Sequence, residues 1–312
     1  MKKLALLFWL ALAAFEAGAQ VDTSRITFQS GGLTLSGKLL MPRGKANLPA
    51  LVFLVGSGGN SSHQSNYRRF LADILEKPFA RDFALLYFDK RGVNESGGKW
   101  HTADFFDRAE DGINAVRYLK TLRQIDTTKI GVVGHSQGGW ICQIMASRYH
   151  SELAFAASLA GPAVSVFEQL AEDYGSQLEC RGMDALRARS KAVRKTKTAF
   201  RASRWLGIFN KNLRQLRVIG KYKPDSQIKN MEIPFLFMFG ENDGLVCPAA
   251  SMARLNRIFT GKIPAHIRTT TIPGSTHSFY VAGKCHEGKS SALRYSPQFE
   301  SEFQGWITEQ VR

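Results

Sequence analysis

The chain has 312 residues, of which 44% are hydrophobic and 22% are charged, and its formal net charge is +16. This composition is ordinary for a soluble globular enzyme, and the length suits one α/β domain of about 250 residues with an insertion, or two small domains. Beyond the N-terminus no segment approaches eighteen apolar residues, which argues against a membrane-spanning helix in the mature protein.

The first nineteen residues have the pattern of a secretory signal peptide. Lys2 and Lys3 are followed by an apolar run of eleven residues, and Ala17-Gly18-Ala19 offers a small-x-small cleavage site. We therefore expect residues 1–19 to be removed and the protein to be exported to a periplasm or beyond. The alternative is an uncleaved anchor, although the apolar run is short for a membrane span.

Short apolar runs alternate with helical patterns along the rest of the chain. The predicted strands cover residues 25–30, 33–41, 49–55, 83–88, 129–133, 153–159, 234–239 and 267–272. Helical patterns cover 107–122, 140–148 and 297–310. Continuous apolar strands that alternate with helices predict an α/β fold with a mostly parallel, doubly wound sheet.

Residues 164–229 break this alternation. They are helical in composition, basic and free of strand patterns, so we predict a helical cap or lid inserted into a core of residues 20–163 and 230–312. From Arg181 to Lys223 there are fourteen Lys or Arg residues and one acid, Asp184. No nucleic-acid-binding architecture accompanies this charge. We expect a solvated basic face that can associate weakly with the anionic cell envelope.

A serine lies on the turn between the strand 129–133 and the helix that follows it. The sequence Gly134-His135-Ser136-Gln137-Gly138 is the Gly-x-Ser-x-Gly pattern of a nucleophile elbow. The turn leaves no room for side chains at the two glycines, and the helix N-terminus behind the serine favours developing negative charge. The alternative is a chance Gly/Ser turn. The strand–turn–helix context favours Ser136 as a nucleophile.

A serine hydroxyl needs a general base, and that base needs an orienting acid. His277 directly follows a predicted strand, whereas His135 lies within the elbow and is expected to point away from the nucleophile. Asp243 follows another strand, with Glu241 as the alternative acid. Functional residues gather at the carboxyl ends of parallel strands, so Ser136, Asp243 and His277 are predicted to form a catalytic triad.

Attack on a carbonyl also requires N–H donors for the oxyanion. We predict the backbone N–H groups of Gln137 and of Ser57, because Gly56 and Gly58 let the backbone turn into the site. A simple glycine turn is the alternative for that loop. No sequence pattern suggests a cofactor or a metal site.

These motifs together resemble the α/β-hydrolase superfamily, in the style of exported bacterial esterases or acyl-peptidase-like serine hydrolases. The resemblance spans nearly the whole mature chain. It differs at Val55-Gly56, where many relatives carry His-Gly. It also implies structural roles for Asp89, Arg91 and Ser96, with Arg91 tying its turn to neighbouring carbonyls or carboxylates.

The expected function is hydrolysis of a small carboxylic ester through an acyl-enzyme on Ser136. One alternative is an aminopeptidase or acyl-peptidase that uses the same triad and anchors a substrate terminus. Its candidate anchors are Glu168, Glu172, Asp173 and Glu179. A second alternative function is that of a non-catalytic fold that binds the cell envelope. Its candidate contacts are Phe200, Trp205, Leu206 and Phe209.

The four cysteines are Cys142, Cys180, Cys247 and Cys285, and they allow three pairings. Cys142, on the helix after the elbow, is expected to be a buried free thiol. Cys247 and Cys285 each lie shortly after a predicted catalytic loop, so a bridge between them is one candidate. The sequence leaves the pairing and the oligomeric state open.

Overall fold

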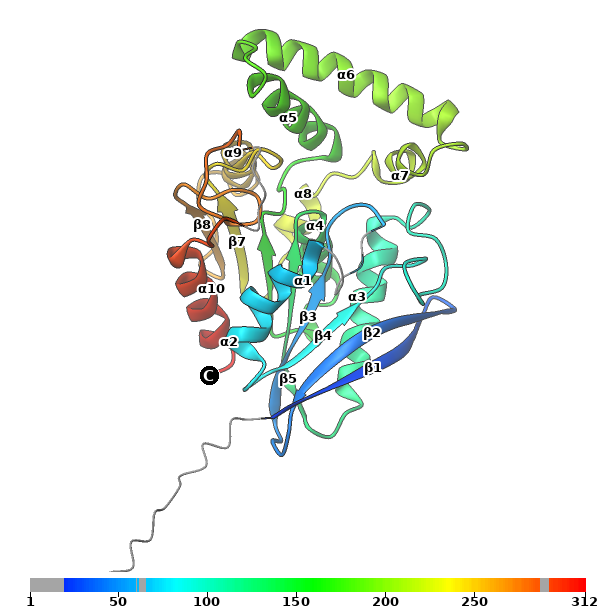
Figure 1. Ribbon diagram of the computed structural model, residues 1–312, viewed down its shortest axis with the longest axis vertical. Helices are drawn as coiled ribbons and strands as arrows, with labels where there is room; N and C mark the ends of the chain where they lie inside the picture. The colour runs from blue at the N-terminus through cyan, green and yellow to red at the C-terminus, as the bar shows by residue number, and fades with distance from the viewer. Residues whose placement is uncertain (1–19, 60, 62–65, 287–291) are drawn as a thin grey trace, which may run out of the picture.

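The computed structural model describes residues 20–59, 61, 66–286 and 292–312, so the predicted signal peptide lies outside the described residues. The core is an eight-stranded sheet in the order β1-β2-β4-β3-β5-β6-β7-β8 (Figure 1). The strands are β1 (Val21–Ser30), β2 (Leu33–Pro42), β3 (Leu48–Leu54), β4 (Ala84–Phe88), β5 (Ile125–His135), β6 (Phe155–Leu159), β7 (Phe235–Gly240) and β8 (Ile267–Ile272).

The strand directions agree with the predicted mostly parallel sheet. β1 and β2 form an antiparallel hairpin, and β2 pairs antiparallel with β4. The hairpin turns at Gly31 and Gly32, whose φ angles of 55° and 73° suit glycine. All pairs from β4 to β8 are parallel. The carboxyl ends of these strands therefore share one edge of the sheet, where loops can bring distant residues together.

Helices cover both faces of the sheet, because successive strand side chains point to opposite sides. Val52 and Leu54 face the layer of α3 (Phe105–Lys120), α4 (Gln137–Arg148), α8 (Asp225–Lys229) and α9 (Pro248–Ile258). Leu51 and Phe53 face the layer of α1 (Asn66–Leu71), α2 (Lys77–Phe79) and α10 (Pro297–Glu309). The doubly wound arrangement is thus confirmed.

Two helical segments are absent from the sequence prediction. One is α1 with α2, which are joined by a π-helical stretch (Ala72–Glu76), and the other is α9. Pro248 occupies the first turn of α9, a position where proline is common. That start signal was available in the sequence.

Between β6 and β7 the chain forms the helices α5 (Val166–Glu179), α6 (Ala185–Leu206), α7 (Lys211–Ile219) and the short α8. We call α5–α7 the helical insertion. It stands beyond the carboxyl edge of the sheet (Figure 1). The buried residues Ala188, Ala192 and Thr196 lie on one side of α6, which packs against α5. Among the described helices, none is long and apolar enough to cross a bilayer.

Candidate active site

Ser136 lies on a strained turn between β5 and α4. Its φ and ψ are 57° and −122°, outside the regions that serine normally adopts. The flanking glycines are sterically required. A Cβ on Gly134 would lie 2.2 Å from the Gly138 carbonyl oxygen, and one on Gly138 would lie 2.1 Å from the Leu54 carbonyl oxygen. The glycine spacing expected for the elbow therefore follows from backbone contacts.

Asp243 and His277 are brought together by the loops after β7 and β8. The Asp243 Oδ2 atom lies 2.7 Å from His277 Nδ1. The Asp243 Oδ1 atom accepts the N–H groups of Leu245 and Val246, each at 2.8 Å, so the buried carboxylate is held in place. Because a carboxylate only accepts, the histidine hydrogen lies on Nδ1, and Nε2 is the acceptor.

The alternative acid, Glu241, has a different partner. Its Oε2 atom accepts the N–H of Gly274 at 2.8 Å. That bond fixes the start of the loop that leads to His277. Of the two acids that the sequence offered, Asp243 is therefore the one that contacts the histidine.

Ser136 and His277 line the same cavity, which has a volume of about 770 Å³ and also contains Ser57. Its walls combine aromatic, aliphatic and polar side chains from α1, α5 and the loops after β7 and β8. They include Tyr67, Phe70, Ser176, Gln177, Leu245 and Tyr280. The described residues of the lining include none from α6 or α7. From the insertion, α5 and its C-cap Cys180 border the site.

A buried lysine holds the loop after β3 in place. Lys90 Nζ donates to the carbonyl oxygen of Gly56 at 2.8 Å and also to that of Gly58. Burial, reinforced by the nearby Arg108, lowers the pKa of Lys90 well below its ordinary value. The Gly56 N–H donates to Tyr67 Oη at 3.0 Å. The next N–H along the chain is that of Ser57, which borders the cavity.

A fully buried arginine joins this loop to the elbow. Arg108 on α3 donates to the carbonyl oxygen of Val55 and to the side-chain oxygen of Gln137, both at 2.5 Å. Burial lowers its pKa to about 10. Arg108 thus ties together the two segments that carry Ser57 and Gln137. Arg108 was not among the predicted site residues, although a cation inside the apolar pattern of residues 107–122 was a visible signal.

His135 connects the β3 loop to the His277 loop. Its Nε2 lies 3.0 Å from the carbonyl oxygen of His277, which can only accept, so Nε2 carries the hydrogen. Its Nδ1 therefore accepts from Tyr67 Oη at 2.9 Å. Burial, with a smaller contribution from His277, lowers the pKa of His135 to about 3. The His135 ring thus supports Tyr67 on α1 and the loop that carries His277.

Because the pKa of His135 is lowered, we expect the folded protein to lose stability in acid. Since its folded pKa of about 3 lies below the ordinary 6.5, the unfolded chain takes up the proton first. Stability is full above pH 6.5 and falls as the pH drops toward 3, by up to about 1.4 kcal/mol per pH unit from this group. Urea unfolding measured from pH 6.5 to pH 3 should give a free energy of unfolding that falls less steeply with decreasing pH in His135→Asn than in the parent protein. An equally steep fall in both proteins would contradict the low pKa of His135.

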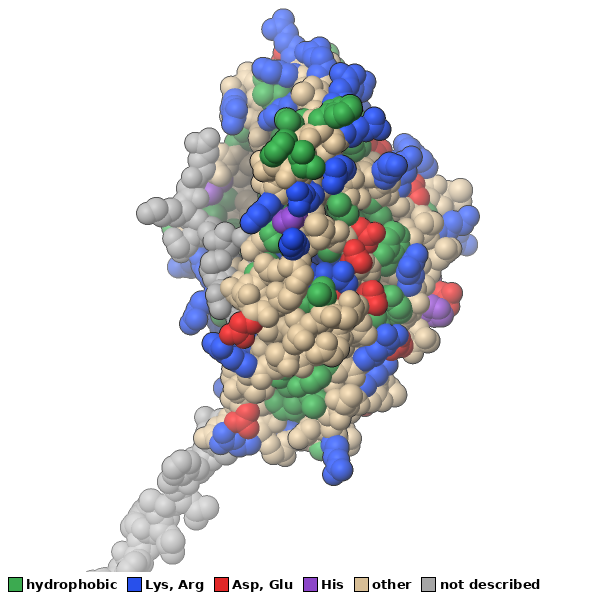
Figure 2. Space-filling model, turned by 90° about the vertical axis from the view of Figure 1, so that its right-hand side faces the viewer, with side chains coloured by type: hydrophobic (Ala, Val, Ile, Leu, Met, Phe, Trp, Pro, Cys, Tyr) green, Lys and Arg blue, Asp and Glu red, His purple; other side chains and the backbone are tan. Residues whose placement is uncertain are grey.

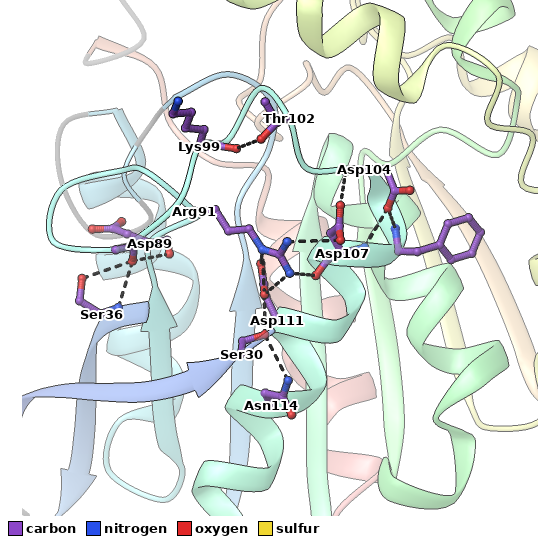
Figure 3. A network of polar contacts seen from close by, with 12 residues as sticks. Ser30, Ser36, Asp89, Arg91, Lys99, Thr102, Asp104, Asp107, Asp111 and Asn114 are labelled. Atoms are coloured by element: carbon purple, nitrogen blue, oxygen red, sulfur yellow. Dashed lines mark hydrogen bonds and ion pairs between the residues drawn. The ribbon is translucent and has the colours of Figure 1, made fainter. Parts of the chain in front are cut away.

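Arg91 forms the structural tie that the resemblance implied. Its guanidinium donates to both carboxylate oxygens of Asp111 at 2.9 Å and to the carbonyl oxygen of Asp107 at 3.2 Å (Figure 3). Ser96 Oγ donates to the carbonyl oxygen of Asp89 at 2.8 Å. These contacts fix the loop after β4 against α3, and the described residues that line the cavity include none of the residues that make them.

The disulfide joins Cys180 to Cys285, so the proposed Cys247–Cys285 bridge is wrong. Cys180 is the C-cap of α5, and Cys285 lies on the loop after His277. The pairing depends on how α5 returns over that loop, which cysteine spacing does not encode. Cys142 is buried and free, as expected, and Cys247 is a half-buried free thiol. The bridge fastens the insertion to the His277 loop.

The sheet order, the strained serine turn and the Asp243–His277 pair together define an α/β-hydrolase fold. Within this class the family model described as BD-FAE matches residues 39–257. The chain therefore belongs to the BD-FAE family.

Several known proteins are similar to this chain. Esterase EstD of Thermotoga maritima is 26% identical over 215 residues, which make up 67% of this chain and 50% of that protein. The chain thus spans about half the length of this curated relative.

Among solved structures, the Pyrococcus furiosus esterase Pf2001 has a TM-score of 0.62 at 18% identity, with 93% of this chain and 91% of that chain covered. Est1E of Butyrivibrio proteoclasticus with ferulic acid bound has a TM-score of 0.59 at 17% identity, with 92% and 99% covered. At these identities the likeness concerns the fold.

Proposed function

We propose that this protein is a serine hydrolase of carboxylic esters, with Ser136 as nucleophile, His277 as general base and Asp243 as orienting acid. The observation that carries the proposal is the 2.7 Å contact between His277 Nδ1 and Asp243 Oδ2 beside a cavity that also contains the elbow serine. The esterase names of the relatives support the same reaction class.

In this mechanism Ser136 Oγ attacks the ester carbonyl carbon while its proton moves to His277 Nε2. Asp243 holds the Nδ1 hydrogen and stabilises the imidazolium. The imidazolium then protonates the departing alcohol oxygen, which leaves an acyl-enzyme on Ser136. Water, activated by His277, attacks the acyl carbon and releases the acid, and Ser136 regains its proton.

The oxyanion would be stabilised by the backbone N–H groups of Ser57 and Gln137. Gln137 is the first residue of α4, where N–H groups have no acceptor within the helix. The Gly56 N–H is directed to Tyr67 Oη, and the next N–H along the β3 loop is that of Ser57, which lines the cavity and is our proposed second donor. Lys90 and Arg108 act as positioning residues. Lys90 holds the carbonyl oxygen of Gly56, whose peptide group carries the Ser57 N–H, and Arg108 joins the Val55 carbonyl oxygen to the Gln137 side chain.

Arg108→Met should therefore lower kcat for ester hydrolysis about 10- to 100-fold with little change in KM, since the two donors would lose their fixed spacing. Steady-state kinetics on p-nitrophenyl acetate measure this split. Arg108→Lys, which keeps a buried donor, should recover part of the loss. A fall in thermal stability with kcat intact would assign Arg108 a purely structural role.

The substrate class follows from the cavity. Its volume suits a small molecule, and its aromatic walls suit an aryl or short acyl group. The bound ferulic acid of Est1E makes a ferulate ester a useful member of the test panel.

Export of the protein is part of this proposal, and the Cys180–Cys285 disulfide supports an oxidising compartment.

The alternative is an aminopeptidase or acyl-peptidase with the same triad. Two of the four candidate anchoring acids have cationic partners, since Glu168 pairs with Arg254 and Glu179 pairs with Lys284. The other two candidates, Glu172 and Asp173, keep this alternative open. Burial, with a smaller contribution from Asp243, raises the pKa of Asp173, whereas the interactions with Gln177 and His277 oppose that rise.

One panel of substrates distinguishes the esterase from the peptidase. We expect hydrolysis of p-nitrophenyl acetate, p-nitrophenyl butyrate and methyl ferulate, and little release of p-nitroaniline from amino-acyl p-nitroanilides. Faster cleavage of the anilides would favour the peptidase. A protein that takes up no fluorophosphonate at Ser136 and hydrolyses neither class would be a non-catalytic member of the fold.

A further inference from the structure

Four large apolar side chains project into solvent at the end of α6 and the turn into α7. Their exposed fractions are 79% for Trp205, 50% for Leu206, 55% for Ile208 and 83% for Phe209. We call these four residues the apolar tip. Figure 2 shows hydrophobic side chains gathered among Lys and Arg on the upper part of the molecule, where the helical insertion lies. Such a gathering of exposed apolar side chains marks an interaction site.

The backbone of the tip is held in one conformation. Arg214 donates from Nε to the carbonyl oxygen of Gly207 at 2.9 Å and from Nη2 to that of Ile208 at 2.7 Å. Asn210 caps α7, since its side-chain oxygen accepts the N–H groups of Asn212 and Leu213. The outward direction of the apolar side chains is therefore built into the turn.

A basic groove of about 500 Å³ adjoins the tip between α6 and α7. Phe167, Phe200 and Leu216 contribute apolar surface to it. Its cationic lining consists of Lys197, Arg201, Arg204, Arg217 and Lys221. The sequence from Ala185 to Lys223 contains no Asp or Glu, so all of the groove lining except Phe167 comes from a stretch of one charge sign. Such a groove suits phosphate groups, which arginine binds well.

The shape of α6 determines how it can meet a surface. Its small inner residues, among them Ala188 and Ala192, are buried on the α5 side, so α6 cannot bury an apolar face in a membrane. Its outer side is basic over 22 residues, a length of about 33 Å. Among the described residues of α6 and the turn into α7, the tip gathers four large exposed apolar side chains, whereas Leu186 stands alone at the opposite end of α6. This combination fits a flat anionic surface with an apolar interior better than a compact protein partner.

We propose that the apolar tip docks the protein on an anionic lipid bilayer. Trp205 and Phe209 enter the boundary between headgroups and acyl chains, where aromatic side chains are favoured. The basic groove binds lipid phosphates, and the outer side of α6 adds long-range attraction to the negative surface. The tip and groove share no described residue with the cavity beside Ser136, so docking is independent of the proposed catalysis.

Vesicle co-sedimentation tests the proposal on the purified protein. We expect binding to vesicles of phosphatidylcholine with added phosphatidylglycerol, weaker binding at high salt, and no binding to phosphatidylcholine alone. The double variant W205A/F209A should bind at least about tenfold more weakly, and R201Q/R204Q should also weaken binding. Rates of p-nitrophenyl acetate hydrolysis and thermal unfolding should match the parent protein, which verifies the fold.

Leu186 provides a matched control, because it is 82% exposed but lies at the opposite end of α6. L186A should bind like the parent protein. Trp205 also supplies a spectroscopic signal: anionic vesicles should shift tryptophan emission to shorter wavelength, and W205F should lose that shift.

Three results would overturn the proposal. They are absence of binding to the anionic vesicles, binding that W205A/F209A leaves unchanged, and a self-associated form that the double variant disperses. The last of these would assign the tip to a second copy of the chain.

Discussion

Replacing Ser136 by alanine is expected to lower kcat for p-nitrophenyl acetate by at least about 10⁴-fold. The proposed mechanism loses its nucleophile in this variant, and only binding and oxyanion stabilisation would remain. Alanine lacks only the hydroxyl and meets the same backbone strain at φ 57°, so the fold should be retained. The measurement is steady-state hydrolysis combined with fluorophosphonate labelling, which should disappear.

Ser278 provides a matched control for this experiment. It lines the same cavity and directly follows His277, but the proposal gives it no chemical role. Ser278→Ala should keep activity within a few-fold of the parent protein and should still be labelled. Undiminished hydrolysis by Ser136→Ala would eliminate the proposed nucleophile, whatever the control shows.

Asp243→Asn is expected to reduce kcat by about 10⁴-fold, because it moves the ring hydrogen of His277 from Nδ1 to Nε2. An asparagine oxygen can still accept the N–H groups of Leu245 and Val246, which leaves its NH₂ group facing His277 Nδ1. Because NH₂ donates, Nδ1 must become the acceptor and the hydrogen moves to Nε2. An Nε2 that carries a hydrogen cannot take the proton of Ser136.

The control for this variant is Glu241→Gln, two residues earlier on the same loop. Glu241 contacts the Gly274 N–H and not His277, so its replacement should leave kcat within about tenfold. Both variants are compared by kcat, KM and thermal unfolding. Activity of Asp243→Asn near that of the parent protein would show that His277 does not need this partner.

Much of the fold could be predicted because it depends on local chemistry. The apolar runs that become β3, β5 and β7 are buried on both faces, and the parallel sheet follows from their alternation with helices. The pairing of Asp243 with His277 was also foreseeable. Each follows a parallel strand, and β7 and β8 are neighbours in the sheet. Helices with weak signals, such as α1 and α9, were missed.

The contacts that support the site were not foreseeable from spacing. Arg108 interrupts an apolar helical pattern, but the sequence does not show that Arg108 and Lys90 are both buried and both hold carbonyl oxygens of the β3 loop. The partner of Cys180 was equally hidden, because it depends on where α5 lies relative to the loop after β8. The exposure of Trp205 at the end of the insertion was hidden as well, because it depends on how α6 packs against α5.

The amino-acid sequence by itself determined the elbow at Ser136, because backbone crowding permits only glycine at Gly134 and Gly138. It also determined the order of strands and helices along the chain, which follows from apolar periodicity. Only the tertiary structure decided which buried cations support the β3 loop, which cysteines pair and which face of the insertion meets solvent. Those features depend on contacts between segments that lie far apart in the chain, and local sequence patterns do not specify such contacts.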